Sequence, residues 1–255
     1  MKSQIDQLKS EAEANYSASR WEDSAKTYEH LVGLAQQNNE LEQAIEFAIA
    51  AIRAWKQITG KEIRINRLYQ SIGLIGVKKA AIGFEEQAKI AETNSELKTS
   101  ALNFEEAGTG YSLIQNYERA KSCFESSAKI FEDLSSRAMS DTDFESAIHM
   151  FDRICNLYEK IVIIYDRILI ERKELDRAAK HSILEEKEKV KRNIILSRKN
   201  KAYSHEKLAQ NYLDRDDPDC NRIAEKEFAK AIEILESIDE MKLAKKLQDK
   251  KDQIT

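Results

Sequence analysis

The stretch that decides the fold runs from Ala101 to Leu134 and reads ALNFEEAGTGYSLIQNYERAKSCFESSAKIFEDL. Small and aromatic residues recur in it three and four residues apart, in two groups. The first group is Phe104, Ala107, Gly108 and Tyr111, and the second is Tyr117, Ala120, Phe124 and Ser127. Residues so spaced share one face of a helix, so the stretch predicts two helices with apolar faces. The short link at 115–117 predicts a tight turn into an antiparallel partner.

This helix pair resembles the tetratricopeptide repeat, because its small and aromatic residues match the signature positions of that motif of about 34 residues. The same spacing returns near the end of the chain, in Ala224, Phe228 and Ala231. Upstream, Ala80 and Phe84 are spaced like Ala120 and Phe124, which predicts a longer repeat there. One pair cannot bury its apolar face alone, so the resemblance implies a right-handed α-solenoid of antiparallel helix pairs.

The composition agrees with a helical protein. Charged residues make up 34% of the chain, with only seven glycines and one proline, which predicts an all-α fold. We expect a single domain over 1–255 with about 11 helices. Helix pairs are expected over 1–134, one long helical hairpin over 141–213, and a C-terminal repeat helix with a capping helix over 214–255.

Helix boundaries are predicted from capping residues and glycines. Asn39 with Glu42, and Thr142 with Glu145, have the spacing of capping boxes. Asp217, just before the only proline, is expected to cap a later helix.

Glycines mark further expected features in the first third of the chain. Gly60 is expected to cap the end of the third helix, and two separate helices should follow over 61–76 and 77–92. Gly73 and Gly76 are interpreted as points of close packing between helices.

A heptad pattern dominates the next part of the chain. Its apolar seam consists of Phe144, Ile148, Phe151, Cys155, Tyr158, Val162, Tyr165 and Leu169. A seam sustained over this length is typical of coiled-coil packing. The sequence therefore leaves open a structural or self-assembling role in which the seam over 144–169 contacts a second copy.

No pattern points to catalysis, to a cofactor or to a metal. The histidines His30, His149, His181 and His205 are scattered, without the short spacing of metal ligands. Phosphate-binding and nucleophile motifs are absent from the sequence, so we expect no enzyme and no cofactor. The three cysteines are odd in number and far apart, which fits a reducing, cytoplasmic location. A net charge of −4 argues against a nucleic-acid partner, and we expect at most peripheral membrane contact.

One segment is strongly basic. Its cations are Lys187, Lys189, Lys191, Arg192, Arg198, Lys199 and Lys201. Glu188 alone opposes these seven residues, so the segment carries a net charge of +6. Such a segment could hold an acidic partner, such as a helical bundle or anionic lipid headgroups. The alternative is a solvated outer face of a long helix.

Among helical-repeat families, the chain most resembles the soluble NSF attachment proteins. The resemblance lies in the mixed repeat lengths, in the string from Asn116 to Ala128, and in Asp-Phe-Glu-Ser-Ala-Ile from Asp143 to Ile148. It implies a curved layer of helices that holds a SNARE bundle by basic residues and presents it to a hexameric AAA+ ATPase. A leucine near the family's C-terminus contributes to ATPase stimulation, and Ile254 occupies the comparable place here.

The expected function is that of a protein-binding scaffold or adaptor without enzymatic activity. In its sharpest form it acts like an attachment protein in vesicle trafficking, as a monomer or weak oligomer. Two alternatives stay open. One is the self-assembling protein described above, and the other is a regulatory tetratricopeptide-repeat domain whose concave groove binds a peptide or small ligand.

Overall fold

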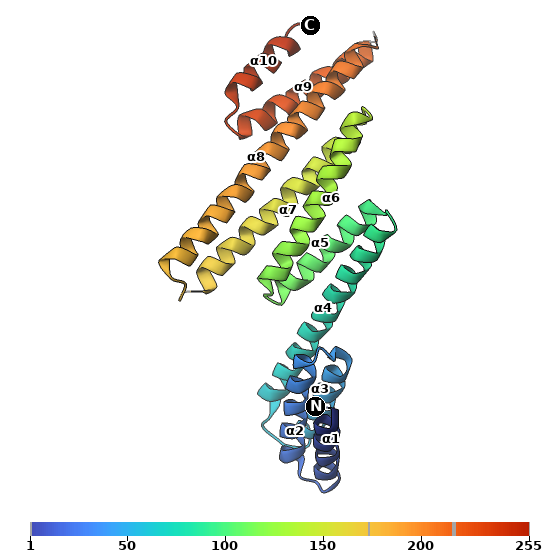
Figure 1. Cartoon of the computed structure of the whole chain (residues 1–255), viewed down its shortest axis with the longest axis vertical. Helices are drawn as coiled ribbons and strands as arrows, with labels where there is room; N and C mark the ends of the chain where they lie inside the picture. The colour runs from blue at the N-terminus through green and yellow to red at the C-terminus, as the bar shows by residue number, and fades with distance from the viewer. Residues whose placement is uncertain (1, 173, 216–217, 255) are drawn as a thin grey trace. The chain divides into compact units, whose positions relative to one another are not determined.

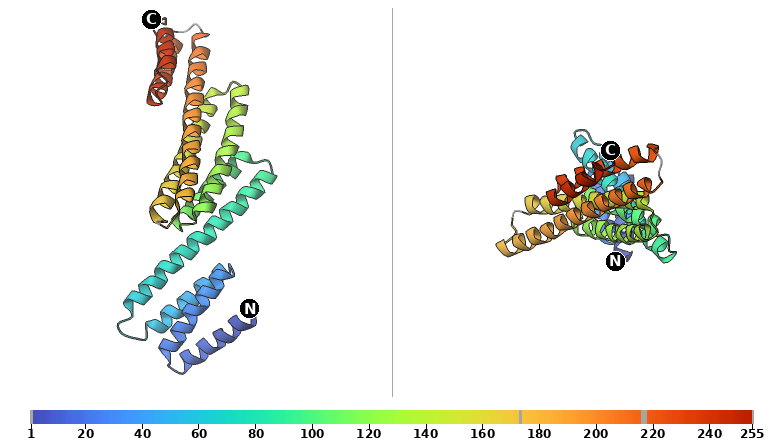
Figure 2. Two further views of the ribbon diagram at one scale, coloured as in Figure 1. Left: turned by 60° about the vertical axis from the view of Figure 1, so that its left-hand side comes forward. Right: turned by 90° about the horizontal axis from the view of Figure 1, so that it is seen from above.

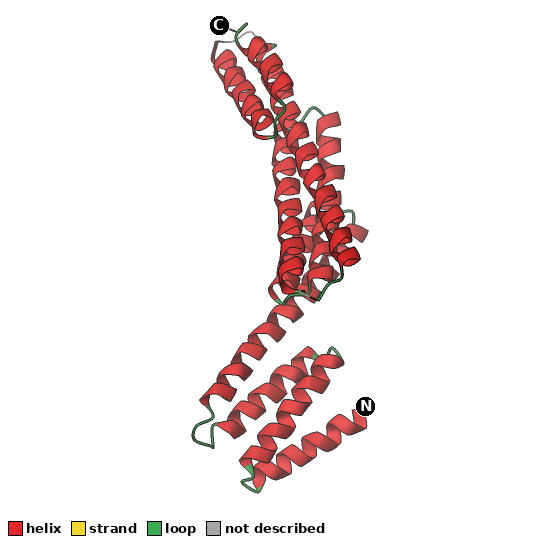
Figure 3. Cartoon of the chain, turned by 90° about the vertical axis from the view of Figure 1, so that its left-hand side faces the viewer, coloured by secondary structure: helices red, strands yellow, loops and turns green. Residues whose placement is uncertain are grey.

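A computed structural model of the chain describes residues 2–172, 174–215 and 218–254. Every regular element within these residues is a helix, and there are ten of them (Figures 1 and 3). The first five are α1 (Lys2–Ser17), α2 (Trp21–Gln37), α3 (Leu41–Trp55), α4 (Glu62–Thr93) and α5 (Leu97–Leu113). The others are α6 (Tyr117–Ser140), α7 (Phe144–Glu171), α8 (Arg177–Leu213), α9 (Pro218–Ser237) and α10 (Met241–Lys251).

The chain divides into two compact units, 1–83 and 84–255, and the boundary falls inside α4. In the first unit, α1 packs on α2 and α2 packs on α3. In the second unit, each helix from α5 to α10 packs on the next one in sequence, and Figure 2 shows α7 and α8 lying side by side. The predicted all-α class is therefore confirmed, with helices that pack consecutively. The single domain over 1–255 stays a prediction.

One turn geometry recurs six times between consecutive helices. Its central residue has a left-handed backbone conformation with φ between 58° and 62°. The residues at this position are Ser19, Asn39, Ser95, Gln115, Thr142 and Asp239. In each turn this residue donates its amide to the carbonyl three residues back, and the next amide donates five residues back. This is the Schellman motif, which satisfies the free carbonyls at a helix end.

In two of these turns the N-cap is one residue later than the capping boxes predict. Asn39 and Thr142 are the left-handed residues of their turns, and the N-caps are Glu40 and Asp143. Both predicted capping boxes are therefore wrong. Asp143 does act as a cap, because its Oδ1 accepts a bond from the amide of Ser146 at 3.1 Å. The predicted cap Asp217 lies outside the described residues.

A small residue follows each of these turns at the fourth position of the new helix. The six residues are Ser24, Ala44, Ser100, Ala120, Ala147 and Ala244, and each is at most 2% exposed. A small side chain at this position lets the new helix approach the preceding one closely. Turn and small residue together make a local repeat that the helices share despite their different lengths.

The signature residues of the opening stretch lie in the core of the second unit. Phe104, Ala107, Tyr111, Tyr117, Ala120 and Phe124 are buried, as are Ala224, Phe228 and Ala231 further along. Gly108 is buried too, and the ring of Phe124 packs directly against it. The aromatic side chains thus fill the space that small residues leave between α5 and α6.

The described part of the chain has ten helices, one fewer than expected, because 61–76 and 77–92 form the single helix α4. Its glycines do not interrupt it, since glycine weakens a helix without breaking it. Around Gly73 and Gly76, apart from the adjacent residues and nearby backbone of α4 itself, no described atom lies within 4 Å of an added β-carbon, so the expected close packing is wrong. Ala80 and Phe84 are exposed, unlike Ala120 and Phe124, so the repeat predicted there is also wrong.

The expected cap at Gly60 is wrong as well. Helix α3 ends at Trp55, and the C-cap is Lys56. Gly60 instead has a φ of 77° in the turn before α4, a conformation that glycine adopts without steric cost.

Most of the heptad seam of α7 is buried inside the second unit, and only Val162 and Leu169 are half-buried. Of its residues, Phe144, Ile148, Phe151, Cys155, Tyr158 and Tyr165 are each at most 8% exposed. Helix α7 packs against both α6 and α8, and these neighbours cover the seam. The seam therefore works as the core of the chain itself.

Candidate functional site

A groove lies across three consecutive helices of the second unit, with a cavity volume of about 680 Å³. Helix α6 contributes Glu132, Ser135, Ser136 and Met139, and α7 contributes Phe151 and Tyr158. Helix α8 contributes Asn193, Leu196, Ser197, Asn200 and Tyr203. Since the two α7 side chains are buried and those of α8 are mostly exposed, α7 forms the floor of the groove and α8 one wall.

The floor and the α6 wall are held by hydrogen bonds within the chain. The hydroxyl of Tyr158 donates to Oε1 of Glu132 at 2.8 Å, and burial raises the pKa of Tyr158 far above its ordinary value. The hydroxyls of Ser135 and Ser136 each donate to the backbone carbonyl of Glu132 at 2.9 Å. This part of the groove is therefore rigid, with its polar groups already bonded.

The α8 wall is different, because most of its side chains are exposed to solvent; Asn193 is hydrogen-bonded to the hydroxyl of Tyr158, and Ser197 is buried. Asn193, Leu196, Asn200 and Tyr203 follow one another at spacings of three and four, so they form one stripe of the helix. Leu196 is 57% exposed and Tyr203 is 47% exposed. The side-chain amide of Asn200 makes no hydrogen bond with any described residue. We call these four residues the α8 stripe.

Sequence reasoning did not find the α8 stripe. Its spacing was a usable signal, because two apolar residues and two amides alternate on one face. In the sequence, however, the strongly charged neighbours of these four residues dominate the pattern and indicate a basic segment. Sequence alone also gives no way to know that α6 and α7 complete a groove beside this face.

A second groove, of about 570 Å³, lies over α5, α6 and α7. Glu105 lies in it and accepts from Arg153 at 3.1 Å and from Lys160 at 2.7 Å. Charged groups in this groove thus already pair with each other, which makes it the weaker candidate for binding.

The basic segment is divided over several sides of α8. Lys187, Arg198 and Lys201 form ion pairs with carboxylates of α7, namely Asp166, Glu159 and Asp152. The Arg198 pair spans 2.9 Å and the Lys201 pair 2.5 Å. Lys199 pairs with Glu240, the N-cap of α10. Four of the seven cations therefore hold neighbouring helices in place.

The other three cations point to solvent. Lys189 pairs with Glu186 at 3.2 Å and Lys191 pairs with Glu188 at 2.6 Å, both within exposed turns of α8. Arg192 is exposed and makes no ion pair with the described residues. It lies one turn before Leu196, so its charge borders the groove.

Ile254, the candidate C-terminal contact, packs within the second unit. Its half-buried side chain lies against the apolar cluster of α8, α9 and α10, which includes Phe228, Leu235 and Leu247.

A helical-repeat protein with an open groove is the class that this geometry defines. Neither a family model nor a curated protein matches the chain. Among the described residues, no group of histidine, cysteine and acidic side chains could hold a metal ion. None of the described helices has the length and apolar character needed to cross a membrane.

Proposed function

We propose that the protein is an adaptor that binds an amphipathic helix of a partner protein in the groove over α6, α7 and α8. The observation that carries this proposal is the α8 stripe, an exposed set of apolar and amide side chains beside a rigid aromatic floor. Side chains three and four residues apart form the ridges with which helices pack together. A partner helix with an apolar face fits such a surface in the manner of helix-in-groove recognition.

The contacts that would favour binding are of two kinds. Leu196 and Tyr203 offer apolar surface, and burying it gains about 25 cal/mol per Å². The amides of Asn193 and Asn200 both donate and accept, so they can bond polar groups along the edge of the partner helix. Arg192 favours acidic residues on the flank nearest to it.

The finer form of the proposal follows the family resemblance. We propose a right-handed α-solenoid of antiparallel helix pairs that holds a SNARE-like bundle in the cytoplasm and presents it to an AAA+ ATPase. The serial packing and the repeated turns support the solenoid. Because α7 and α10 already neutralise four basic residues, any electrostatic grip would depend on Lys189, Lys191 and Arg192.

The groove is tested by binding of a purified SNARE-type helical bundle, followed by fluorescence anisotropy. We expect the double variant Leu196→Ala/Tyr203→Ala to weaken binding at least about tenfold, which corresponds to about 1.4 kcal/mol. The matched control is Ile163→Ala/Ile170→Ala, which removes two apolar residues outside the groove that are at least as exposed on average. Equal affinities for both double variants would remove the groove from the proposal.

The charge contribution is tested by comparing Arg192→Glu with Arg198→Glu. Arg192→Glu should weaken binding at low salt and leave the melting temperature unchanged, because Arg192 holds no neighbouring helix. Arg198→Glu should lower stability by about 1 kcal/mol, since it replaces the pair with Glu159 by a repulsion. If Arg192→Glu binds like the original chain, Arg192 takes no part in selecting the partner.

The alternatives differ in what they require of this surface. Self-assembly through 144–169 would need the seam exposed, whereas it lies inside the second unit. A regulatory domain that captures an extended peptide would use the same groove. Circular dichroism distinguishes an amphipathic helix from an extended peptide in the groove. A partner peptide gains helical signal on binding only if it binds as a helix.

A further inference from the structure

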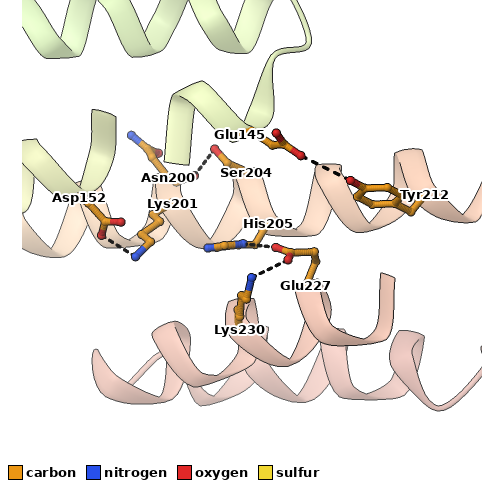
Figure 4. A network of polar contacts seen from close by, with 9 residues as sticks. All are labelled: Glu145, Asp152, Asn200, Lys201, Ser204, His205, Tyr212, Glu227 and Lys230. Atoms are coloured by element: carbon orange, nitrogen blue, oxygen red, sulfur yellow. Dashed lines mark hydrogen bonds and ion pairs between the residues drawn. The ribbon is translucent and has the colours of Figure 1, made fainter. Parts of the chain in front are cut away.

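The contact between α8 and α9 has an ionisable pair at its centre. Around the pair, small residues bring the helices together, namely Ala202 and Ala209 of α8 with Ala224 and Ala231 of α9. Nδ1 of His205 lies 2.6 Å from Oε2 of Glu227, as Figure 4 shows. Their side chains are only 7% and 10% exposed, so the pair is almost closed off from water.

Further charged groups lie on the helices around this pair, and Lys201 and Lys230 act on the imidazole directly. Lys230 of α9 lies 2.6 Å from Glu227, on the carboxylate oxygen that His205 leaves free (Figure 4). One turn before His205, Lys201 pairs with Asp152 of α7. From α10, Lys250 lies 2.5 Å from Glu206 of α8. Two ammonium groups therefore already lie near the imidazole, and an additional positive charge is poorly tolerated.

The protonation states follow from these surroundings. Burial lowers the pKa of His205, and Lys201 and Lys230 add to that, although Glu227 opposes it. Burial alone would raise the pKa of Glu227, but its bonds to Lys230 and His205 lower it below its ordinary value. At neutral pH a neutral imidazole thus donates its Nδ1 hydrogen to an ionised carboxylate.

We propose that α9 and α10 form a pH-sensitive pair of helices, docked on α8 while His205 is neutral and released when it takes up a second proton. The proton comes from water and binds Nε2, which leaves an imidazolium in a buried site near two lysines. In the released state the same imidazole is solvated and accepts the proton near its ordinary pKa of 6.5. Released chains bind more protons than docked chains below that pH, so acid shifts the equilibrium toward release.

Helix α8 stays in place in this mechanism. Lys187, Arg198 and Lys201 tie it to α7 through carboxylates that need no histidine. Phe228, Leu235 and Leu247 belong to one apolar cluster that joins α9 and α10 to each other and to α8. Because α9 packs on α10 as well as on α8, the two terminal helices can leave α8 together once the surface ion pairs Lys199–Glu240 and Lys250–Glu206 separate.

Hydrogen exchange with mass spectrometry tests the proposal on the full chain, with rates corrected for intrinsic pH dependence. Between about pH 7.5 and about pH 5.5, the opening constant of 219–251 should rise at least about threefold more than that of α5 and α6. His205→Gln keeps a donor and cannot titrate, so it should abolish this difference. His149→Gln, on the exposed side of α7, should leave it intact.

A second variant guards against misfolding of the first. Glu227→Gln removes the acceptor charge and should raise exchange of 219–251 already at neutral pH. The proposal is overturned if His205→Gln retains the pH response of the original chain. It is equally overturned if acid raises exchange evenly over α5 to α10.

Discussion

The ring of Phe124 lies so close to Gly108 that a β-carbon built on the glycine would be 2.7 Å from both Cδ1 and Cε1 of the ring. Such a distance is far below van der Waals contact, and the ring is only 2% exposed, so it has no space to move into. The glycine of the opening stretch is thus required by a side chain of the next helix.

Gly108→Ala is therefore expected to destabilise the second unit by about 1 to 3 kcal/mol through overpacking. Gly33→Ala is the matched control, because apart from the adjacent residues and nearby backbone of its own helix no described atom lies within 4 Å of its added β-carbon. There the better helix propensity of alanine should stabilise the protein by about 0.5 to 1 kcal/mol. Urea unfolding followed by circular dichroism measures both, and shifts of the same sign would contradict the packing account.

The turn at Thr142 offers a second test. A β-branched residue there has a φ of 60°, in a region that only glycine adopts readily. Thr142→Gly should raise the free energy of unfolding by about 1 kcal/mol, whereas Thr142→Ala should change it little. The gain from glycine would be absent if this turn were not left-handed in solution.

Two buried serines in neighbouring helices should respond in opposite directions. Ser127 donates to the carbonyl of Ala101 at 2.7 Å, so Ser127→Ala should cost about 0.5 to 1.5 kcal/mol. The buried hydroxyl of Ser100 has no hydrogen-bond partner among the described residues, and Ser100→Ala should stabilise by about 1 kcal/mol. Thermal melts of the two variants decide this, and a loss of stability in Ser100→Ala would show that its hydroxyl has a partner.

The parts of the fold that depend on local sequence patterns were predictable from the sequence. The apolar spacing around Phe104 and Phe124 predicts helices and their buried faces correctly, because helical periodicity is written into consecutive residues. Helix ends were less predictable. Asn39 and Thr142 look like caps in sequence, but the Schellman turn places them in the left-handed position and gives the cap to the next residue.

The candidate site was even less predictable from local sequence patterns than the helix ends. The basic segment stands out in sequence, yet its individual cations have different roles. Arg198 and Lys201 bind carboxylates about 40 to 50 residues away in the chain, while Arg192 points to solvent. Charge counted along a sequence cannot reveal these partners, because they come from another helix.

By itself, the sequence determined that this protein is built of helices whose small and aromatic residues pack in a repeated order. That information is local, since each helix face is set by residues three and four apart. Only the tertiary structure decided which cations remain free, that Leu196 and Tyr203 border a groove, and that His205 meets Glu227 in a closed contact. These relationships join side chains from different helices, so they depend on how the helices pack and not on any one stretch of the chain.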